Sequence, residues 1–422
     1  KVSSGKDGIQ MVNKNSKRET WSFKPLNDYL DLLTDYDANG SFADMAANVH
    51  TEWGHGYAWY VRATDLEQNL SMADVRYADE YSYNFLEKTS LFGGELLMAK
   101  RGEIGKIYFF QMRSKYATLA PNLYLLKLND RMDSRFLYYY FLSSEGQKKI
   151  KAINASTSLG AIYKDDVKRI LVPELDIKEQ KQIAETLSGI DSLISKLQEL
   201  IVKKKNIRQG TMQRVLTGKN RLQGFSSEWK DTTLGNICDI KDGTHQTPHY
   251  VESGIPFYSV ETVTNDDFTH VKYISLEEHE RLTSSYKIEN GDVLMTRIGS
   301  IGKGKYVDWN PNASFYVSLA LLKFRGNKPL ANFIALLTGT EEFQKEAELH
   351  SLQFAIPMKI NLGQISDIRV RIPAEESEIK AIITMLNDMG SEIKRLEQKL
   401  NKYKLLKQGM MEELLTGKVR LM

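Results

Sequence analysis

The stretch VLTGKNRL, at Val215–Leu222, returns almost unchanged as LLTGKVRL at Leu414–Leu421, about 200 residues later. A second pair of stretches aligns without gaps: GELLMAKRGEIGK at Gly94–Lys106 and GDVLMTRIGSIGK at Gly291–Lys303. Similar features therefore occur twice in the same order. This predicts a duplicated unit, with a period too long for a solenoid of short repeats.

A long helical segment precedes each copy of the LTGK-x-RL motif. Its apolar residues recur alternately four and three positions apart, the a and d pattern of a coiled coil. They are Ile183, Leu187, Ile190, Ile194, Leu197 and Ile201 in the first segment, and Ile382, Leu386, Met389, Ile393, Leu396, Leu400 and Tyr403 in the second. One such stripe also fits a helix packed on its own domain, but two of matched phase favour pairing of the helices. Roughly 40 residues at ~1.5 Å each predict a rod of about 60 Å that holds the globular parts apart.

The globular parts mix short β-like runs with a few helices. The β-like runs are KIYFF (Lys106–Phe110), NLYLLKL (Asn122–Leu128), GDVLMTR (291–297) and SLALLKF (Ser318–Phe324), and helices are predicted at Ser134–Ile150 and Leu330–Ala347. The predicted fold class is α+β, with two mixed α/β domains separated by two long antiparallel coiled-coil helices and an internal pseudo-twofold repeat. The predicted segments are a polar N-terminal extension (1–20), a first domain (21–172), a first helical spacer (173–222), a second domain (223–372) and a second helical spacer (373–422).

Composition narrows the class of protein. The chain has 422 residues with 57 basic and 54 acidic side chains, a net charge of +3 that permits a nucleic-acid partner without requiring one. The single cysteine, Cys238, excludes an internal disulfide and is typical of a reducing cytoplasm. No apolar run approaches the ~18 residues of a membrane span, and residues 1–20 lack the apolar core of a signal peptide.

Catalytic and metal-binding patterns do not emerge from the sequence. Lys106 and Lys303 each end a G-x-x-G-K run, which is shorter than a phosphate-binding Walker A loop and lacks its Ser or Thr. His245 and His249 are four residues apart, as in some zinc sites, but the Gly and Pro of DGTHQTPHY (Asp242–Tyr250) predict a loop. Side chains of this loop suit base edges and phosphates instead.

The combination of these features resembles the specificity subunit of type I restriction–modification enzymes. The resemblance covers nearly the whole chain from Trp21, and its most specific parts are the two LTGK-x-RL motifs, the paired glycine-rich runs, and DGTHQTPHY followed by GIPFYSV. The first copy departs from the pattern: DYDANGSFADM (Asp35–Met45) stands where the second copy has DGTH, so no reader residue can be transferred there.

The resemblance implies a function and a set of partners. Each globular domain would be a target recognition domain that reads one half of a split sequence in double-stranded DNA, and the helices would set the gap. The chain would be non-catalytic and hold no cofactor. Two modification subunits would carry S-adenosylmethionine, and restriction subunits would use ATP and Mg. The repeated motif would complete the helical scaffold and dock these partners, so deleting Leu414–Met422 would weaken assembly and leave each domain folded.

DNA contacts are expected from basic residues beside glycines and from the polar loop. In the first domain the candidates are Arg62, Lys100, Arg101 and Lys106; in the second they are Thr244, His245, Gln246, His249, Tyr250, Arg297 and Lys303. The glycines of the paired runs also fit simple hairpin turns with solvated bases, and the residues alone do not choose between the two interpretations. Two other functions stay open at this stage, a stand-alone DNA-binding regulator and a coiled-coil scaffold protein.

Overall fold

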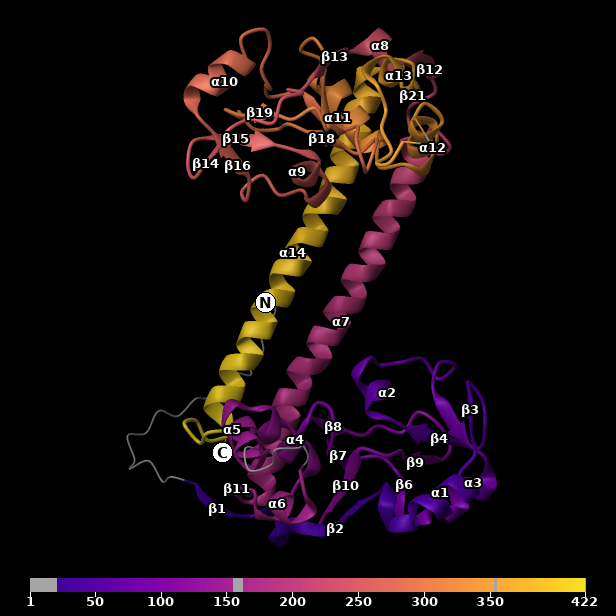
Figure 1. The fold of residues 1–422 in the computed structure, drawn as a ribbon, viewed down its shortest axis with the longest axis vertical. Helices are drawn as coiled ribbons and strands as arrows, with labels where there is room; N and C mark the ends of the chain where they lie inside the picture. Colours follow the sequence, from indigo (N-terminus) through magenta and orange to yellow (C-terminus); the bar gives the residue numbers. More distant parts are fainter. Residues whose placement is uncertain (1–20, 155–161, 353–354, 422) are drawn as a thin grey trace, which may run out of the picture. The chain divides into compact units, whose positions relative to one another are not determined.

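The computed structural model describes residues 21–154, 162–352 and 355–421 and divides into two compact units. The first unit joins the chain up to Lys196 with the chain from Leu400 onward, and the second unit is Leu197–Lys399. Each unit contains one globular domain and one part of each long helix, α7 (Ile177–Val215) and α14 (Glu376–Leu414) (Figure 1). The chain thus leaves the first unit along α7 and returns to it along α14. The predicted extension 1–20 lies outside the described residues.

The globular domain of the first unit is built on two main β-sheets. A four-stranded antiparallel sheet has the order β2 (Leu30–Asp35), β10 (Leu123–Leu128), β7 (Leu96–Ala99), β8 (Ile107–Phe109). A five-stranded sheet has the order β3 (Thr51–Trp53), β5 (Arg76–Ala78), β4 (Ala58–Val61), β9 (Ala117–Leu119), β6 (Ser90–Leu91). Among the described strands of this sheet, β4 and β9 form a parallel pair and the other pairs are antiparallel. A third, two-stranded sheet joins β1 (Ser22–Pro25) to β11 (Leu171–Glu174).

The apolar runs of the sequence become strands buried on both faces. In β7, Leu96 and Met98 pack into a core with the helices, while Leu97 and Ala99 pack into a separate core with the five-stranded sheet. Successive side chains of a strand point to opposite faces, so a strand between two cores must be apolar at every position. This is why LLMA, at Leu96–Ala99, is a continuous apolar run and not an alternating one.

The second unit repeats this topology. Its four-stranded sheet has the order β13 (Asp239–Asp242), β20 (Leu319–Lys323), β17 (Val293–Thr296), β18 (Gly304–Tyr306). Its second sheet has the order β14 (Tyr250–Val251), β16 (Lys272–Ile274), β15 (Ile255–Tyr258), β19 (Ser314–Phe315), again with one parallel pair, β15–β19. A small sheet joins β12 (Lys230–Thr233) to β21 (Arg369–Ile372). The predicted repeat of mixed domains is therefore confirmed.

Each predicted long helix of the globular parts is two shorter helices. Residues 134–150 form α4 (Ser134–Leu142) and α5 (Ser144–Asn154), and residues 330–347 fall in α11 (Lys328–Leu337) and α12 (Glu341–Leu349). The breaks occur at hydroxyl residues in extended conformation that accept bonds from the next helix. The Ser143 hydroxyl accepts from the amide of Gly146, and that of Thr340 accepts from the amide of Phe343. Such N-cap bonds stabilise a new helix start.

The two long helices pair antiparallel, with contacts present in both units. In the second unit Lys204 pairs with Glu392 and Lys205 with Glu397, at 2.8 and 2.7 Å. In the first unit Lys407 pairs with Asp191 at 2.7 Å. The apolar a and d residues of the two long helices pack in two different environments. The first of these residues in each helix join the core of the adjacent domain, as Ile183 and Ile382 do, while later ones such as Ile201 and Ile393 are buried outside those cores.

The first copy of the LTGK-x-RL motif ends α7 and packs into the core of the second unit. Leu216 is fully buried in the main core of that unit. Gly218 has a left-handed φ of +72° and lies against the Trp229 ring, where an added Cβ would be 3.2 Å from the ring. A helix commonly ends on such a glycine. Arg221 then forms a two-pronged ion pair with the buried Glu378 in the first turn of α14, at 2.6 and 2.8 Å.

The motif of the second copy closes the first unit in the same way. Leu415 is 1% exposed, and Gly417 has φ +71° against the ring of Trp21. Arg420 binds Glu179, in the first turn of α7, through two contacts of 2.6 Å. Each copy of LTGK-x-RL therefore fastens the helix it ends to the start of the other long helix, which explains why the sequence needs it twice.

This arrangement corrects one prediction. The motif was expected to complete the helical scaffold and dock partners, and deletion of Leu414–Met422 was expected to weaken assembly and leave each domain folded. Leu414 and Leu415 belong to the hydrophobic core of the first unit, together with Phe136 and Leu187. Removing them would open that core, because deleting a buried Leu side chain alone costs about 2–5 kcal/mol.

Candidate nucleic-acid interface

The polar loop of the second unit, residues 243–249, connects the two sheets of its domain. It leaves β13 at Asp242 and enters the edge strand β14 at Tyr250. Its start is fixed because the amide of Thr244 donates to the carbonyl of Phe315, at 3.2 Å, and its carbonyl accepts from the amide of Val317, at 3.0 Å. Beyond this anchor His245, Gln246 and His249 are exposed, as base-reading side chains must be.

Three charged or titratable side chains, Arg297, Asp242 and His245, form a connected series that holds this loop. Arg297 is only 8% exposed, and its Nη1 donates to Asp242 Oδ1 at 2.8 Å. The other carboxylate oxygen of Asp242 lies 2.7 Å from Nε2 of His245. Asp242 thus links a buried cation to the exposed side chain of His245. Arg297 was predicted to contact phosphate; its burial and its partner assign it instead to holding the loop.

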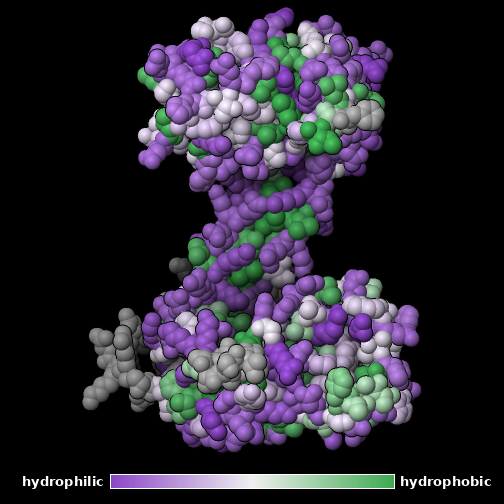
Figure 2. Space-filling model, in the orientation of Figure 1, coloured by the Kyte–Doolittle hydropathy of each residue, from purple (hydrophilic) through white to green (hydrophobic). Residues whose placement is uncertain are grey.

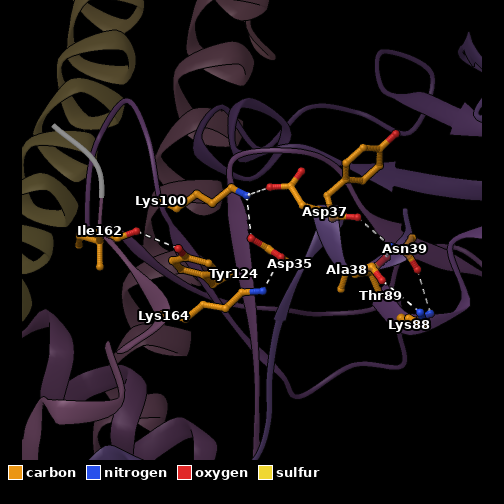
Figure 3. A network of polar contacts seen from close by, with 11 residues as sticks. Asp35, Asp37, Ala38, Asn39, Lys88, Thr89, Lys100, Tyr124, Ile162 and Lys164 are labelled. Atoms are coloured by element: carbon orange, nitrogen blue, oxygen red, sulfur yellow. Dashed lines mark hydrogen bonds and ion pairs between the residues drawn. The ribbon is translucent and has the colours of Figure 1, made fainter. Parts of the chain in front are cut away.

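The first domain contains an equivalent pair, shown in Figure 3. Lys100 is 8% exposed, and its Nζ lies 2.8 Å from carboxylate oxygens of both Asp35 and Asp37. Lys164 binds the second oxygen of Asp35 at 2.7 Å. Burial alone would raise the pKa of Asp35, but bonds and charge from the two lysines outweigh it and hold that pKa below its ordinary value. Lys100 is therefore also an internal residue and not the surface phosphate ligand that was predicted.

Strand register shows that the two pairs occupy the same place. Asp35 and Asp242 each end the first strand of the four-stranded sheet, opposite Tyr124 and Ala320. Those residues in turn lie opposite Met98 and Met295, each two positions before the buried cation. The aspartate of DGTH thus has a counterpart in the first copy, although no sequence alignment showed it.

The paired glycine runs form hairpin turns. Gly105 and Gly302 have left-handed φ angles, and their amides donate to the carbonyls of Ala99 and Thr296. Gly105 also packs so closely on Ile150 that a Cβ would lie 2.1 Å from that side chain. The turn interpretation therefore accounts for the glycines.

The basic candidates beside these turns differ in their pairing. Lys106 lies beside Glu103 and, at 3.3 Å, beside Glu67, and the hydrogen bond to Glu103 raises the pKa of Lys106. Arg101 and Lys303 are exposed, and no carboxylate of the described residues pairs with either. These two remain available for phosphate, whereas Lys106 is already neutralised.

Arg62 binds inside its own domain and also marks a feature that the sequence did not reveal. Its guanidinium makes two contacts with the buried Asp65, at 2.9 and 2.5 Å, and lies 4.6 Å from the ring centroid of Trp53. Trp53 is 54% exposed on the edge strand β3. An exposed Trp beside a guanidinium is an unusual surface feature, and neither spacing nor composition singled it out.

Within 21–154, 162–352 and 355–421, no helix combines the length and apolar character needed to cross a bilayer. In the same ranges no three His, Cys, Asp or Glu side chains gather in a way that could hold a metal ion.

Comparison with known proteins places the chain. The profile of the type I restriction modification DNA specificity domain matches twice, at residues 19–204 and 226–404. The chain belongs to this family. Each match takes in one globular domain and most of the long helix that follows it, so the specificity subunit is a tandem of two specificity domains.

Relatives agree with this assignment along most of the chain. The type I restriction enzyme MjaVIII specificity subunit of Methanocaldococcus jannaschii is 24% identical over 343 residues, which are 77% of this chain and 79% of the relative. Two solved structures share the fold. The S subunit from M. genitalium has a TM-score of 0.56 and 17% identity, covering 96% of this chain and 99% of that one. The HsdS subunit from Thermoanaerobacter tengcongensis has a TM-score of 0.52 and 16% identity, covering 95% and 98%.

Proposed function

We propose that this specificity subunit reads a bipartite site in double-stranded DNA, with one half read by each globular domain. The observation that carries the proposal is the matched junction in the two domains, where a buried cation–aspartate pair ends the first strand and the chain then runs to an exposed sheet edge. The frame is shared and the loops built on it differ. A shared frame with different loops suits two readers of different sequences.

The proposal includes no chemistry within this chain. Methylation would be performed by two modification subunits that hold S-adenosylmethionine, and translocation and cleavage by restriction subunits that use ATP and Mg. The long helices would set the distance between the half-sites, because α7 and α14 each continue without a break through both units for 39 residues, about 60 Å.

The surface of the long helices supports docking of a partner. On the face seen in Figure 2, apolar side chains interrupt the polar surface of these helices. Large apolar residues exposed on them are Leu193, Leu200, Val202, Ile207, Leu405 and Leu406. Val202 and Ile207 line one groove of α7 together with Lys203 and Arg214. We assign this groove to helices of a modification subunit, since an apolar stripe with a rim of charged and polar side chains suits a partner helix.

The deciding experiment is coexpression with the cognate modification subunit, followed by methylation sequencing of the host DNA. The expected result is one split motif methylated in both halves. Replacing residues 223–372 with the corresponding domain of another specificity subunit should then change one half of the motif and keep the other. A chain that purifies alone, binds DNA and adds no methylation would instead support a stand-alone regulator, and a chain without salt-dependent DNA affinity would support a scaffold.

A further inference from the structure

The edge strand that follows each recognition loop carries an exposed aromatic ring beside a cation from the neighbouring strand. In the first unit Trp53 ends β3, and the guanidinium of Arg76 lies 4.9 Å from its ring centroid. In the second unit Tyr250 begins β14, and Nζ of Lys272 lies 4.5 Å from its ring centroid. The rings are 54% and 39% exposed. Both distances are within the range of cation–π attraction.

The two cations occupy the same position in the repeated topology. Arg76 lies two residues before Ala78, which faces Ala58 across the sheet, and Lys272 lies two residues before Ile274, which faces Ile255. The strands that carry them, β5 and β16, each lie next to the edge strand. The cation position therefore belongs to the frame of both domains. The rings come from different register positions, since Trp53 lies opposite Arg76 and Tyr250 lies opposite Ile274.

These cations also keep their charge unneutralised. Among the residues that the structure describes, neither Arg76 nor Lys272 has a carboxylate within ion-pair distance, unlike Lys100 and Arg297. Arg76 instead donates to the hydroxyl of Thr51 at 3.0 Å. An aromatic face can hold a cation in place without cancelling its charge, so each pair presents a positioned positive charge to solvent.

We propose that Trp53–Arg76 and Tyr250–Lys272 are two clamps for the sugar–phosphate backbone of duplex DNA, one for each half-site, with their cations at equivalent positions of the two domains. The cation binds a phosphate, and the ring lies against the adjoining deoxyribose. This inference rests on the proposed function and deepens it. Duplex DNA is favoured as the ligand because Tyr250 directly follows the exposed loop of His245–His249. Backbone contacts beside base readers fix the register of a recognition element on the duplex.

The test measures DNA affinity of the full chain, bound to its cognate modification subunits, across a series of salt concentrations. The duplexes carry either the split motif found by methylation sequencing or a scrambled sequence. Arg76→Gln and Lys272→Gln should each weaken binding to both duplexes by a similar factor. Losing one phosphate contact should lower the slope of log K against log salt by about 0.9, which is about fivefold in affinity at 0.15 M salt. Trp53→Ala should weaken binding in the same direction by releasing Arg76.

The matched control lies at the opposite edge of the same sheet in the first unit. Phe92 follows β6, is 67% exposed and has Nζ of Lys127 at 4.9 Å from its ring centroid. Lys127→Gln should leave both affinity and salt slope unchanged. Trp53→Phe, which keeps an aromatic face, should retain most of the binding and serves if Trp53→Ala fails to fold.

The outcomes separate the two proposals. If the wild-type complex binds the split motif and the Arg76 and Lys272 variants keep its salt slope, the clamps are refuted and the proposed function stands. If only the scrambled duplex loses affinity, the clamps are refuted as well. If the wild-type complex itself has no salt-dependent affinity for DNA, the proposed function fails first.

Discussion

At the scale of single residues, the main finding is that conspicuous basic residues hold loops in place. Lys100 and Arg297 follow a buried strand and precede a glycine turn, a setting that suggests a surface charge. Each is buried against an aspartate more than fifty residues away in the sequence. Sequence spacing cannot reveal such a pair, because register across the sheet brings its members together. His245 and Gln246, in contrast, are exposed in a loop, as loop composition indicated, and their contact with DNA stays a prediction.

The pair at Asp35 predicts a stability that depends on pH. The pKa of Asp35 is below its ordinary value in the folded chain, so its contribution is fully present above about pH 4 and disappears as pH falls through the folded pKa. Asp35→Asn should lower stability by about 1–3 kcal/mol at pH 7. Chemical unfolding at several pH values should show the stabilities of wild type and variant converging as pH falls through the folded pKa of Asp35. A constant difference from pH 7 to pH 2 would contradict this account.

Arg297 predicts a stability effect where a phosphate ligand would give only an affinity effect. Arg297→Met leaves the partly buried Asp242 without its cation and should cost about 2–3 kcal/mol in urea unfolding. Lys303→Met changes an exposed cation in the same hairpin and should stay within about 0.5 kcal/mol of wild type. If the two variants were equally stable, Arg297 would not hold the loop, and its predicted role as a phosphate ligand would stand.

At the scale of elements, periodicity predicted both long helices, and short apolar runs predicted the strands β8, β10, β17 and β20. The sequence failed where tertiary contacts decide. The breaks at Ser143 and Thr340 depend on single cap bonds within otherwise helical runs. The structural role of LTGK-x-RL could not be predicted from the sequence either, because the Trp and the Glu that it contacts lie outside the motif. A motif's recurrence indicated that it matters, and only the fold showed what it binds.

Two glycines, one in the motif and one in the helix before it, predict opposite effects for the same substitution. Gly417→Ala adds a Cβ at a left-handed φ, 2.8 Å from the Trp21 ring, and should cost about 1 kcal/mol or more. Gly409→Ala, within α14 and with nothing inside 4 Å of the added Cβ, should stabilise by about 0.5–1 kcal/mol. Thermal unfolding of both variants would show the difference in sign, and a shift in the same direction would argue against the cap.

The apolar groove on α7 predicts a loss of assembly without loss of stability. Val202 and Ile207 are 58% and 45% exposed, so replacing both with Ser removes little buried area from the free chain. Copurification with the modification subunit should fall by at least tenfold, while the unfolding midpoint stays close to wild type. Leu276→Ser, at a residue 57% exposed on α10 (Leu276–Leu282), is the control and should copurify normally. Unchanged copurification of the double variant would exclude the groove as the dock.

At the scale of the whole molecule, each unit is completed by a segment from the other repeat. Leu216 belongs to the first copy in sequence and to the second unit in structure, and Leu415 belongs to the second copy and to the first unit. Leu415→Ala should therefore destabilise the first unit by about 2–5 kcal/mol. Limited proteolysis should cut first within residues 21–196, and Leu216→Ala should reverse the order of cutting. Cleavage in the same unit for both variants would contradict the conclusion that each unit is completed by a segment of the other repeat.

Completion of each unit by a segment of the other repeat also has a consequence for folding during synthesis. The second unit lies entirely within Leu197–Lys399, whereas the core of the first unit includes Leu415. A ribosome adding about 5–20 residues per second needs roughly 10–40 s to travel from the end of the first segment to that leucine. Throughout that time the earliest domain exposes an unfilled apolar surface. A messenger RNA truncated within the second half would therefore encode a product whose first domain lacks part of its core and is open to proteases. It would not yield one intact recognition domain.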